Sequence, residues 1–95
     1  MDKQTILAFL KENRTMLQEK YQIKKIGLFG SYVKGEETSE SDIDILVDMP
    51  SSFDLYYDLK EFLEKSFGKS IDLGMEKNIR KLIRSKIEED IVYVT

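Results

Sequence analysis

Two apolar runs joined by one short segment constrain the fold of this chain more than any other feature. The runs are KKIGLFG (residues 24–30) and DIDILVD (residues 42–48), and each has the length and apolar density of a buried strand. Strands that follow one another in sequence usually lie side by side. The roughly eleven residues between these two predict a hairpin. The end of the first strand would then meet the start of the second.

The remaining segments predict helices and two further strands. Asp2 can cap a helix that extends to about Lys20. Ser51 and Asp54 have the spacing of a capping box for a second helix, which Gly68 is placed to end. Residues 69–75 predict a third strand and residues 91–94 a last one. Between these two, Asn78 can cap a short helix whose four apolar residues would face inward: Ile79, Leu82, Ile83 and Ile87.

This order of elements predicts an α+β domain with a small mixed sheet of about four strands and flanking helices. We expect residues 1–95 to form a single domain. No apolar run approaches the roughly 18 residues of a membrane span, and the N-terminus has no signal-peptide pattern. A soluble, cytoplasmic protein without a membrane partner is the expectation.

Composition restricts the chemistry that is open to the chain. Cysteine and histidine are both absent, which excludes thiolate catalysis, imidazole bases and the usual zinc sites. Acid–base or metal chemistry must therefore use carboxylates. The formal net charge of −3 argues against broad nucleic-acid binding through phosphate contacts, although a local basic patch remains open.

Carboxylates recur where the strands are predicted to begin. Asp42 and Asp44 would point to one face of their strand, about 7 Å apart, and can converge on hard cations such as Mg²⁺, which prefers oxygen ligands. An exposed strand face is the simpler interpretation of such a pair, but the apolar run after Asp44 makes a covered strand more consistent with the sequence. Asp72 would join the cluster if its strand lies beside this one. Asp48 is interpreted as structural.

A small flexible pair lies at the other end of the linking segment. Gly30 and Ser31 follow the first strand and precede a possible helical turn, where unpaired backbone amides favour a phosphate. Lys34 could place a cation near the same phosphates. Each of these residues also fits ordinary turn chemistry. An anion site beside a pair of carboxylates nevertheless describes a pocket for a nucleoside triphosphate.

LFGSYVKGEETSESDIDILV (residues 28–47) resembles the signature of the nucleotidyltransferase superfamily related to DNA polymerase beta, and in particular its minimal nucleotidyltransferases. The resemblance covers nearly the whole chain. It implies that Gly30 and Ser31 hold the triphosphate, and that Asp42, Asp44 and Asp72 are the catalytic carboxylates that ligate two Mg²⁺ ions. Many relatives have arginine at the position of Lys34, so a forked phosphate contact would become a point charge here.

The resemblance further implies transfer of AMP from ATP to a tyrosine of a HEPN ribonuclease toxin, with this protein as the antitoxin. The chain is too short to carry an acceptor site of its own, so another protein is expected to supply it in a homo- or hetero-oligomer. Two alternatives stay open: an antitoxin that masks its partner by contact, and a small-molecule nucleotidyltransferase completed by a second subunit. Arg80, Lys81, Arg84 and Lys86 form either a solvated helix face or a contact surface for such a partner.

Overall fold

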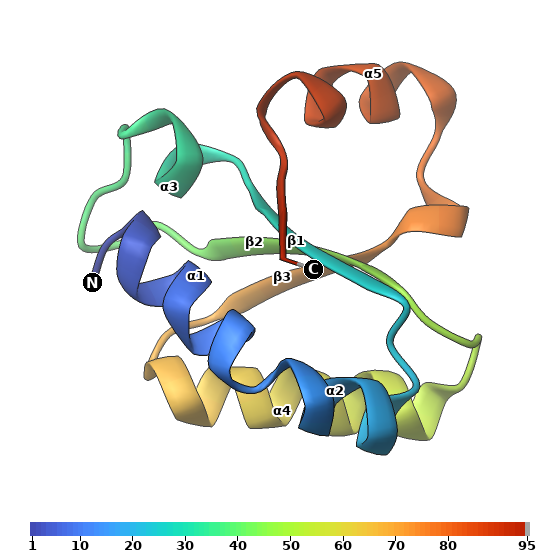
Figure 1. Cartoon of the computed structure of the whole chain (residues 1–95). Coiled ribbons are helices and arrows are strands. Elements are labelled where there is room, and N and C mark those ends of the chain that lie inside the picture. Colours follow the sequence, from blue (N-terminus) through green and yellow to red (C-terminus); the bar gives the residue numbers. More distant parts are fainter. Residues whose placement is uncertain (95) are drawn as a thin grey trace.

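The computed structural model describes residues 1–94, which form an α+β fold with one four-stranded mixed sheet (Figure 1). The helices are α1 (Lys3–Glu12), α2 (Arg14–Tyr21), α3 (Ser31–Lys34), α4 (Phe53–Phe67) and α5 (Lys81–Asp90), with a 3₁₀ turn η1 (Glu76–Asn78). The strands are β1 (Lys25–Phe29), β2 (Ile43–Asp48), β3 (Ile71–Met75) and β4 (Val92–Val94). The predicted fold class is confirmed. Within residues 1–94, no helix is long and apolar enough to cross a membrane.

The sheet has the strand order β3-β2-β1-β4. The strands β1 and β2 form the predicted hairpin, and β4 is also antiparallel to β1. The third strand lies beside the second, as expected, and runs parallel to it. Because β2 and β3 are parallel, their N-terminal ends lie side by side. The C-terminal end of β1 lies at this same end of the sheet.

The main core lies between one face of the sheet and the helices α1, α2 and α4 (Figure 1). Alternate residues of the strands point into it, as the two-residue period of a strand requires. Fully buried members include Ile6, Leu10, Leu28, Ile43, Ile45, Leu59 and Leu63. This face uses the isoleucines of β2, and Asp44 between them is consequently directed to the opposite face.

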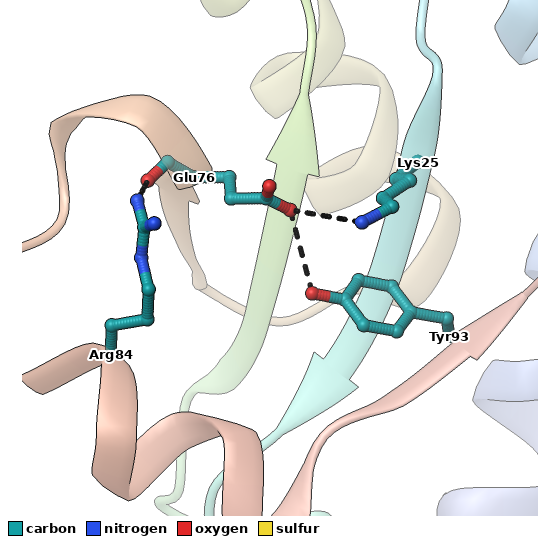
Figure 2. A network of polar contacts seen from close by, with 4 residues as sticks. All are labelled: Lys25, Glu76, Arg84 and Tyr93. Carbon is teal, nitrogen blue, oxygen red and sulfur yellow. Dashed lines mark hydrogen bonds and ion pairs between the residues drawn. The ribbon is translucent and has the colours of Figure 1, made fainter.

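The opposite face of the sheet carries α5, which Figure 1 shows on the far side from α1 and α4. A polar network ties α5 and η1 to the strands (Figure 2). The Oε2 atom of Glu76 lies 3.9 Å from Nζ of Lys25 and accepts a 3.4 Å hydrogen bond from the Tyr93 hydroxyl, while Arg84 donates to the Glu76 carbonyl at 2.6 Å. Arg84 is the residue through which α5 joins this network, and the buried Ile87 adds an apolar contact.

Several expected element boundaries are wrong, each for a local reason. The first helix is broken at Asn13, where the backbone (φ −98°, ψ 9°) leaves the helical region. The Asn13 side-chain amide donates to the Phe9 carbonyl, which also accepts the Asn13 backbone N–H. The cap of α4 is Ser52, one residue later than expected, because its hydroxyl accepts from Leu55 N. Asn78 lies within η1 and does not cap α5, which starts after Arg80.

The expected inward face of α5 is also wrong in part. Ile87 is buried, whereas Leu82 is 86% exposed and Ile83 is 53% exposed. The helix therefore lies on the sheet through its second half, and the apolar residues of its first half face solvent.

Candidate functional site

Asp44 and Asp72 lie side by side at the start of the two parallel strands. They are register partners in the β2–β3 pairing, so their side chains project from the same face of the sheet. The carboxyl group of Asp72 is close enough to raise the pKa of Asp44. Asp42 is exposed, precedes β2 directly, and is close enough to contribute repulsion at Asp44. The structure thus brings Asp44 and Asp72, 28 positions apart in sequence, side by side, with Asp42 exposed nearby.

The surroundings of Asp44 strongly favour its protonated form. Partial burial is the main cause, and the charges of Asp72 and Asp42 add to it, so the pKa of Asp44 rises from 3.8 to about 6. A carboxyl group that is buried beside two others is costly when ionised. A cation bound among them would remove that cost.

The Gly30–Ser31 segment packs directly on this acid pair. Gly30 has φ +80° and ψ −151°, a conformation that is essentially restricted to glycine. A Cβ atom at this position would overlap the carboxylate of Asp44. Glycine is therefore needed here for two reasons, backbone conformation and close approach. The predicted proximity of the Gly-Ser end to the doubled aspartate is a feature of the structure.

The other two residues of the expected anion site lie in α3. Ser31 is half-buried at the start of this short helix, which the sequence had indicated as a helical turn ending at Gly35. Lys34, the last residue of α3, forms an ion pair with Asp90 at the end of α5, with Nζ 3.4 Å from Oδ2. The structure thus does not direct Lys34 to the acid pair. Its ammonium group is engaged by a carboxylate of another helix.

Two side chains of α4 hold the outer edge of β3 on either side of Asp72. Glu64 accepts a hydrogen bond from the backbone N–H of Ile71 at 3.2 Å. The Tyr56 hydroxyl donates to the carbonyl of Leu73 at 2.6 Å. Burial raises the pKa of Tyr56, the charge of Lys60 opposes this, and Tyr57 and Asp72 add smaller upward effects. Sequence reasoning had missed Tyr56 and Glu64, because nothing in a helical sequence shows which neighbouring strand its polar residues reach.

A groove of about 350 Å³ lies between the start of α4 and the second half of β3, lined by Phe53, Tyr56, Tyr57, Leu73 and Met75 together with Ser51, Ser52 and Asn78. The groove is not above the acids. Leu73 and Met75 point to the opposite face of β3 from Asp72, since neighbouring residues of a strand alternate. The groove and the acid pair therefore lie on opposite faces of the sheet.

The acid cluster has the donor chemistry of a site for a hard divalent cation. Its potential ligands are all carboxylate oxygens, which is the set that Mg²⁺ prefers. Within the described residues 1–94, no three acidic side chains are gathered tightly enough to enclose an ion as they stand. Asp44 and Asp72 are register partners whose carboxyl groups repel each other when both are ionised. A dication would offset this repulsion, so the residues fit the cation by their chemistry.

Comparison with known proteins identifies the family. The model of the nucleotidyltransferase domain family matches residues 10–94. This chain is a nucleotidyltransferase. The match covers the Gly-Ser segment, all three acids and the strands that carry them, and family members use a nucleoside triphosphate and a divalent metal ion. The nucleotidyltransferase studied here is accordingly an enzyme of the transferase class.

Two relatives match the nucleotidyltransferase over nearly its whole length. A protein of Methanocaldococcus jannaschii, provisionally named a protein adenylyltransferase, is 44% identical over 94 residues, which cover 94% of each chain. The protein adenylyltransferase MntA of Thermococcus cleftensis is 36% identical over 91 residues, covering 94% of this chain and 92% of the relative. The predicted resemblance to minimal nucleotidyltransferases is confirmed.

Solved structures agree with this assignment. A provisionally assigned minimal nucleotidyltransferase superposes with a TM-score of 0.80 at 26% identity, covering 97% of this chain and 95% of that one. A complex of a tri-AMPylated HEPN toxin with its MNT antitoxin, from Shewanella oneidensis, matches with a TM-score of 0.64 at 18% identity, covering 92% of this chain and 70% of that one. The second likeness shows a shared fold.

Proposed function

We propose that this nucleotidyltransferase transfers AMP from ATP to a hydroxyl group of a partner protein, most simply a tyrosine of a HEPN-type toxin, and thereby acts as an antitoxin. The observation that carries the proposal is the Asp44–Asp72 pair at the N-terminal ends of the parallel strands β2 and β3, with Gly30 packed against Asp44. The named activities of the relatives support a protein acceptor. The S. oneidensis complex supports a HEPN partner for a protein of this fold.

In the proposed reaction the acceptor oxygen attacks the α-phosphorus of ATP. The bond between the α-phosphorus and the bridging oxygen to the β-phosphate breaks, and pyrophosphate leaves with the electron pair. The acceptor hydroxyl gives up its proton, and Asp72, the exposed acid of the pair, is the group assigned to receive it. Gly30 and Ser31 position the triphosphate through backbone amides and the Ser31 hydroxyl.

Asp42, Asp44 and Asp72 would hold two Mg²⁺ ions, which would neutralise charge on the triphosphate and on the acceptor oxygen. The carboxylates themselves contribute in a second way. Because they repel one another, the empty site is poised to bind cations. Lys34 can add a point charge at the phosphates only after its ion pair with Asp90 opens.

A transfer assay tests the proposal. The protein is mixed with Mg²⁺, ATP labelled on the α-phosphate and a HEPN-type protein from the same organism. We expect label on the HEPN protein with the wild type, and none with Asp42→Asn, Asp44→Asn or Asp72→Asn. Asp48→Asn is the matched control, because it makes the same charge change at the other end of β2. It should transfer label as the wild type does.

A pair of glycine variants tests the phosphate segment in the same assay. Gly30 and Gly35 both have positive φ, but a Cβ at Gly35 meets nothing within 4 Å. Gly35→Ala therefore adds only backbone strain, of about 1–2 kcal/mol, whereas Gly30→Ala also displaces Asp44. We expect activity to be lost only in Gly30→Ala. Toxin neutralisation that survives all three Asn substitutions, with no transferred label, would replace catalysis by simple masking.

A further inference from the structure

The first half of α5 presents an apolar and basic surface, of which only Arg84 contacts the rest of the fold through a hydrogen bond that the described residues 1–94 record. Leu82 and Ile83 are 86% and 53% exposed. Around them lie Arg80, Lys81, Arg84 and Lys86, all exposed. We call these six residues the α5 surface. Within residues 1–94, Arg80, Lys81 and Lys86 form no ion pair, and Arg84 donates only to the Glu76 carbonyl.

The charges of the α5 surface do not stabilise the helix that carries them. Residues 80–87 contain four cations and no acid, whereas Glu88, Glu89 and Asp90 follow directly. Cations at the N-terminal end and anions at the C-terminal end both oppose the helix dipole. The N-cap Arg80 makes no side-chain capping bond either. A sequence that breaks several local rules at one site, without gain to the fold, indicates selection for another role.

The α5 surface lies on the same side of the sheet as the side chains of Asp44 and Asp72. Helix α5 covers the face opposite the main core (Figure 1), which is the face that Asp44 and Asp72 share. Its last residue, Asp90, is paired with Lys34 of α3, and α3 begins directly after Gly30. A protein held on α5 is thus on the same side as the transfer site.

We propose that the α5 surface is the docking site for the acceptor protein, and that it recognises an acidic surface that contains an apolar cleft. This inference rests on the proposed function. Leu82 and Ile83 would fill the cleft, and the four cations would pair with carboxylates at its rim. The chain as a whole has a net charge of −3, so the attraction is local. A protein suits this surface better than RNA because phosphate contacts do not use exposed Leu and Ile side chains.

A double charge reversal provides the test. In Arg80→Glu/Lys81→Glu the new acids lie at the N-terminal end of α5, where the helix dipole favours them, so the melting temperature should stay or rise. Lys3→Glu/Lys24→Glu is the matched control: it makes the same change in net charge, and Lys3 is likewise the first residue of its helix, α1. Leu82→Ser tests the apolar part at a side chain that is 86% exposed.

The readouts are the Kd for the HEPN-type protein, measured by titration calorimetry at 50 and 300 mM salt, and the KM for that protein and for ATP in the transfer assay. We expect the reversal and Leu82→Ser each to weaken Kd and raise the acceptor KM by roughly tenfold or more, with the KM for ATP unchanged and the control as the wild type. The effect of the reversal should shrink at high salt.

The outcomes separate this inference from the proposed function. If the wild type transfers AMP and the α5 variants bind and transfer equally well, the docking site is wrong and the function stands. If the wild type transfers nothing to a bound HEPN-type protein, the function is wrong. A fluorescent 20-nucleotide RNA is titrated in parallel. Tight binding of this RNA that is lost in the reversal, with HEPN binding intact, would overturn the inference in favour of a nucleic-acid surface.

Discussion

Asp44 is the residue at which the electrostatics of the site converge. It is packed under Gly30 and repelled by the charges of Asp72 and Asp42. These contacts raise its pKa to about 6, so the ionised form is the costly one at neutral pH. Under the proposed function, Asp44 is a residue whose ionised form serves the reaction but opposes folding, a combination that is common where pKa values are perturbed.

Asp44→Asn should be more stable than the wild type in EDTA, and the difference should depend on pH. Because the folded-state pKa is above that of the unfolded chain, folding takes up a proton between about pH 4 and 6. The contribution of the protonated Asp44 carboxyl group to the free energy of unfolding is complete below about pH 4 and is lost as pH rises through about 6. We expect the gain in melting temperature of Asp44→Asn to grow over that range and to level off above it, in melts followed by circular dichroism.

Asp48→Asn serves as the control for this melt, because it lies in the same strand and removes the same charge. Addition of Mg²⁺ should raise the melting temperature of the wild type and leave Asp44→Asn unchanged. A variant that is less stable than the wild type at pH 8 without metal would return Asp44 to a structural role.

At the scale of elements, α4 and β3 act together at the site. Tyr56 and Glu64 are eight residues apart in α4, and they bond to the backbone on the two sides of Asp72. The edge strand has no neighbour beyond it in the sheet, so these two bonds fix its outer side. They also occupy backbone groups that an added strand would need, which protects the edge.

Tyr56→Phe should reduce transfer more than it reduces stability. The substitution removes the donor to the Leu73 carbonyl, which costs about 1 kcal/mol, and leaves Asp72 on a looser strand. We expect kcat to fall by roughly tenfold or more, because a displacement of about 1 Å in a reacting group can reduce the rate by about 100-fold. The KM for ATP should change little. Tyr57→Phe is the control, because Tyr57 is its exposed neighbour in the same helix. Equal kcat in the two variants would exclude Tyr56 as a positioning residue.

Helices and strands with a clear apolar periodicity were predictable from the sequence, whereas the polar side-chain contacts between them were not. The alternation in residues 42–48 correctly directed Asp44 away from its apolar neighbours, because strand geometry alone decides it. Asp72 lies beside Asp44 because β2 and β3 pair in parallel. The sequence alone did not show that these two strands are neighbours. The break at Asn13 is a departure of one residue from helical backbone angles, which an apolar period does not mark. The outward position of Leu82 depends on how α5 lies on the sheet, and helical periodicity does not contain that information either.

At the scale of the whole molecule, α5 connects the proposed docking surface with α3, which follows Gly30 and carries Lys34. It begins with the α5 surface and ends at Asp90, whose carboxylate holds Lys34. The expectation that Lys34 serves the phosphates came from its position after Gly-Ser. The structure adds a competitor for the same ammonium group, and the strength of that competition can be measured.

Asp90→Asn should lower the KM for ATP. The Lys34–Asp90 pair is partly exposed, and such pairs are worth up to about 1 kcal/mol, which corresponds to a change of about fivefold at most. Removing the carboxylate releases Lys34 to the triphosphate, and Lys34→Ala should raise KM in both backgrounds to the same value. Glu89→Gln is the matched control, since it removes the same charge from the adjacent residue, for which no partner is recorded within residues 1–94. If Glu89→Gln lowers KM as far as Asp90→Asn does, the effect is general electrostatics and the ion pair does not regulate nucleotide binding.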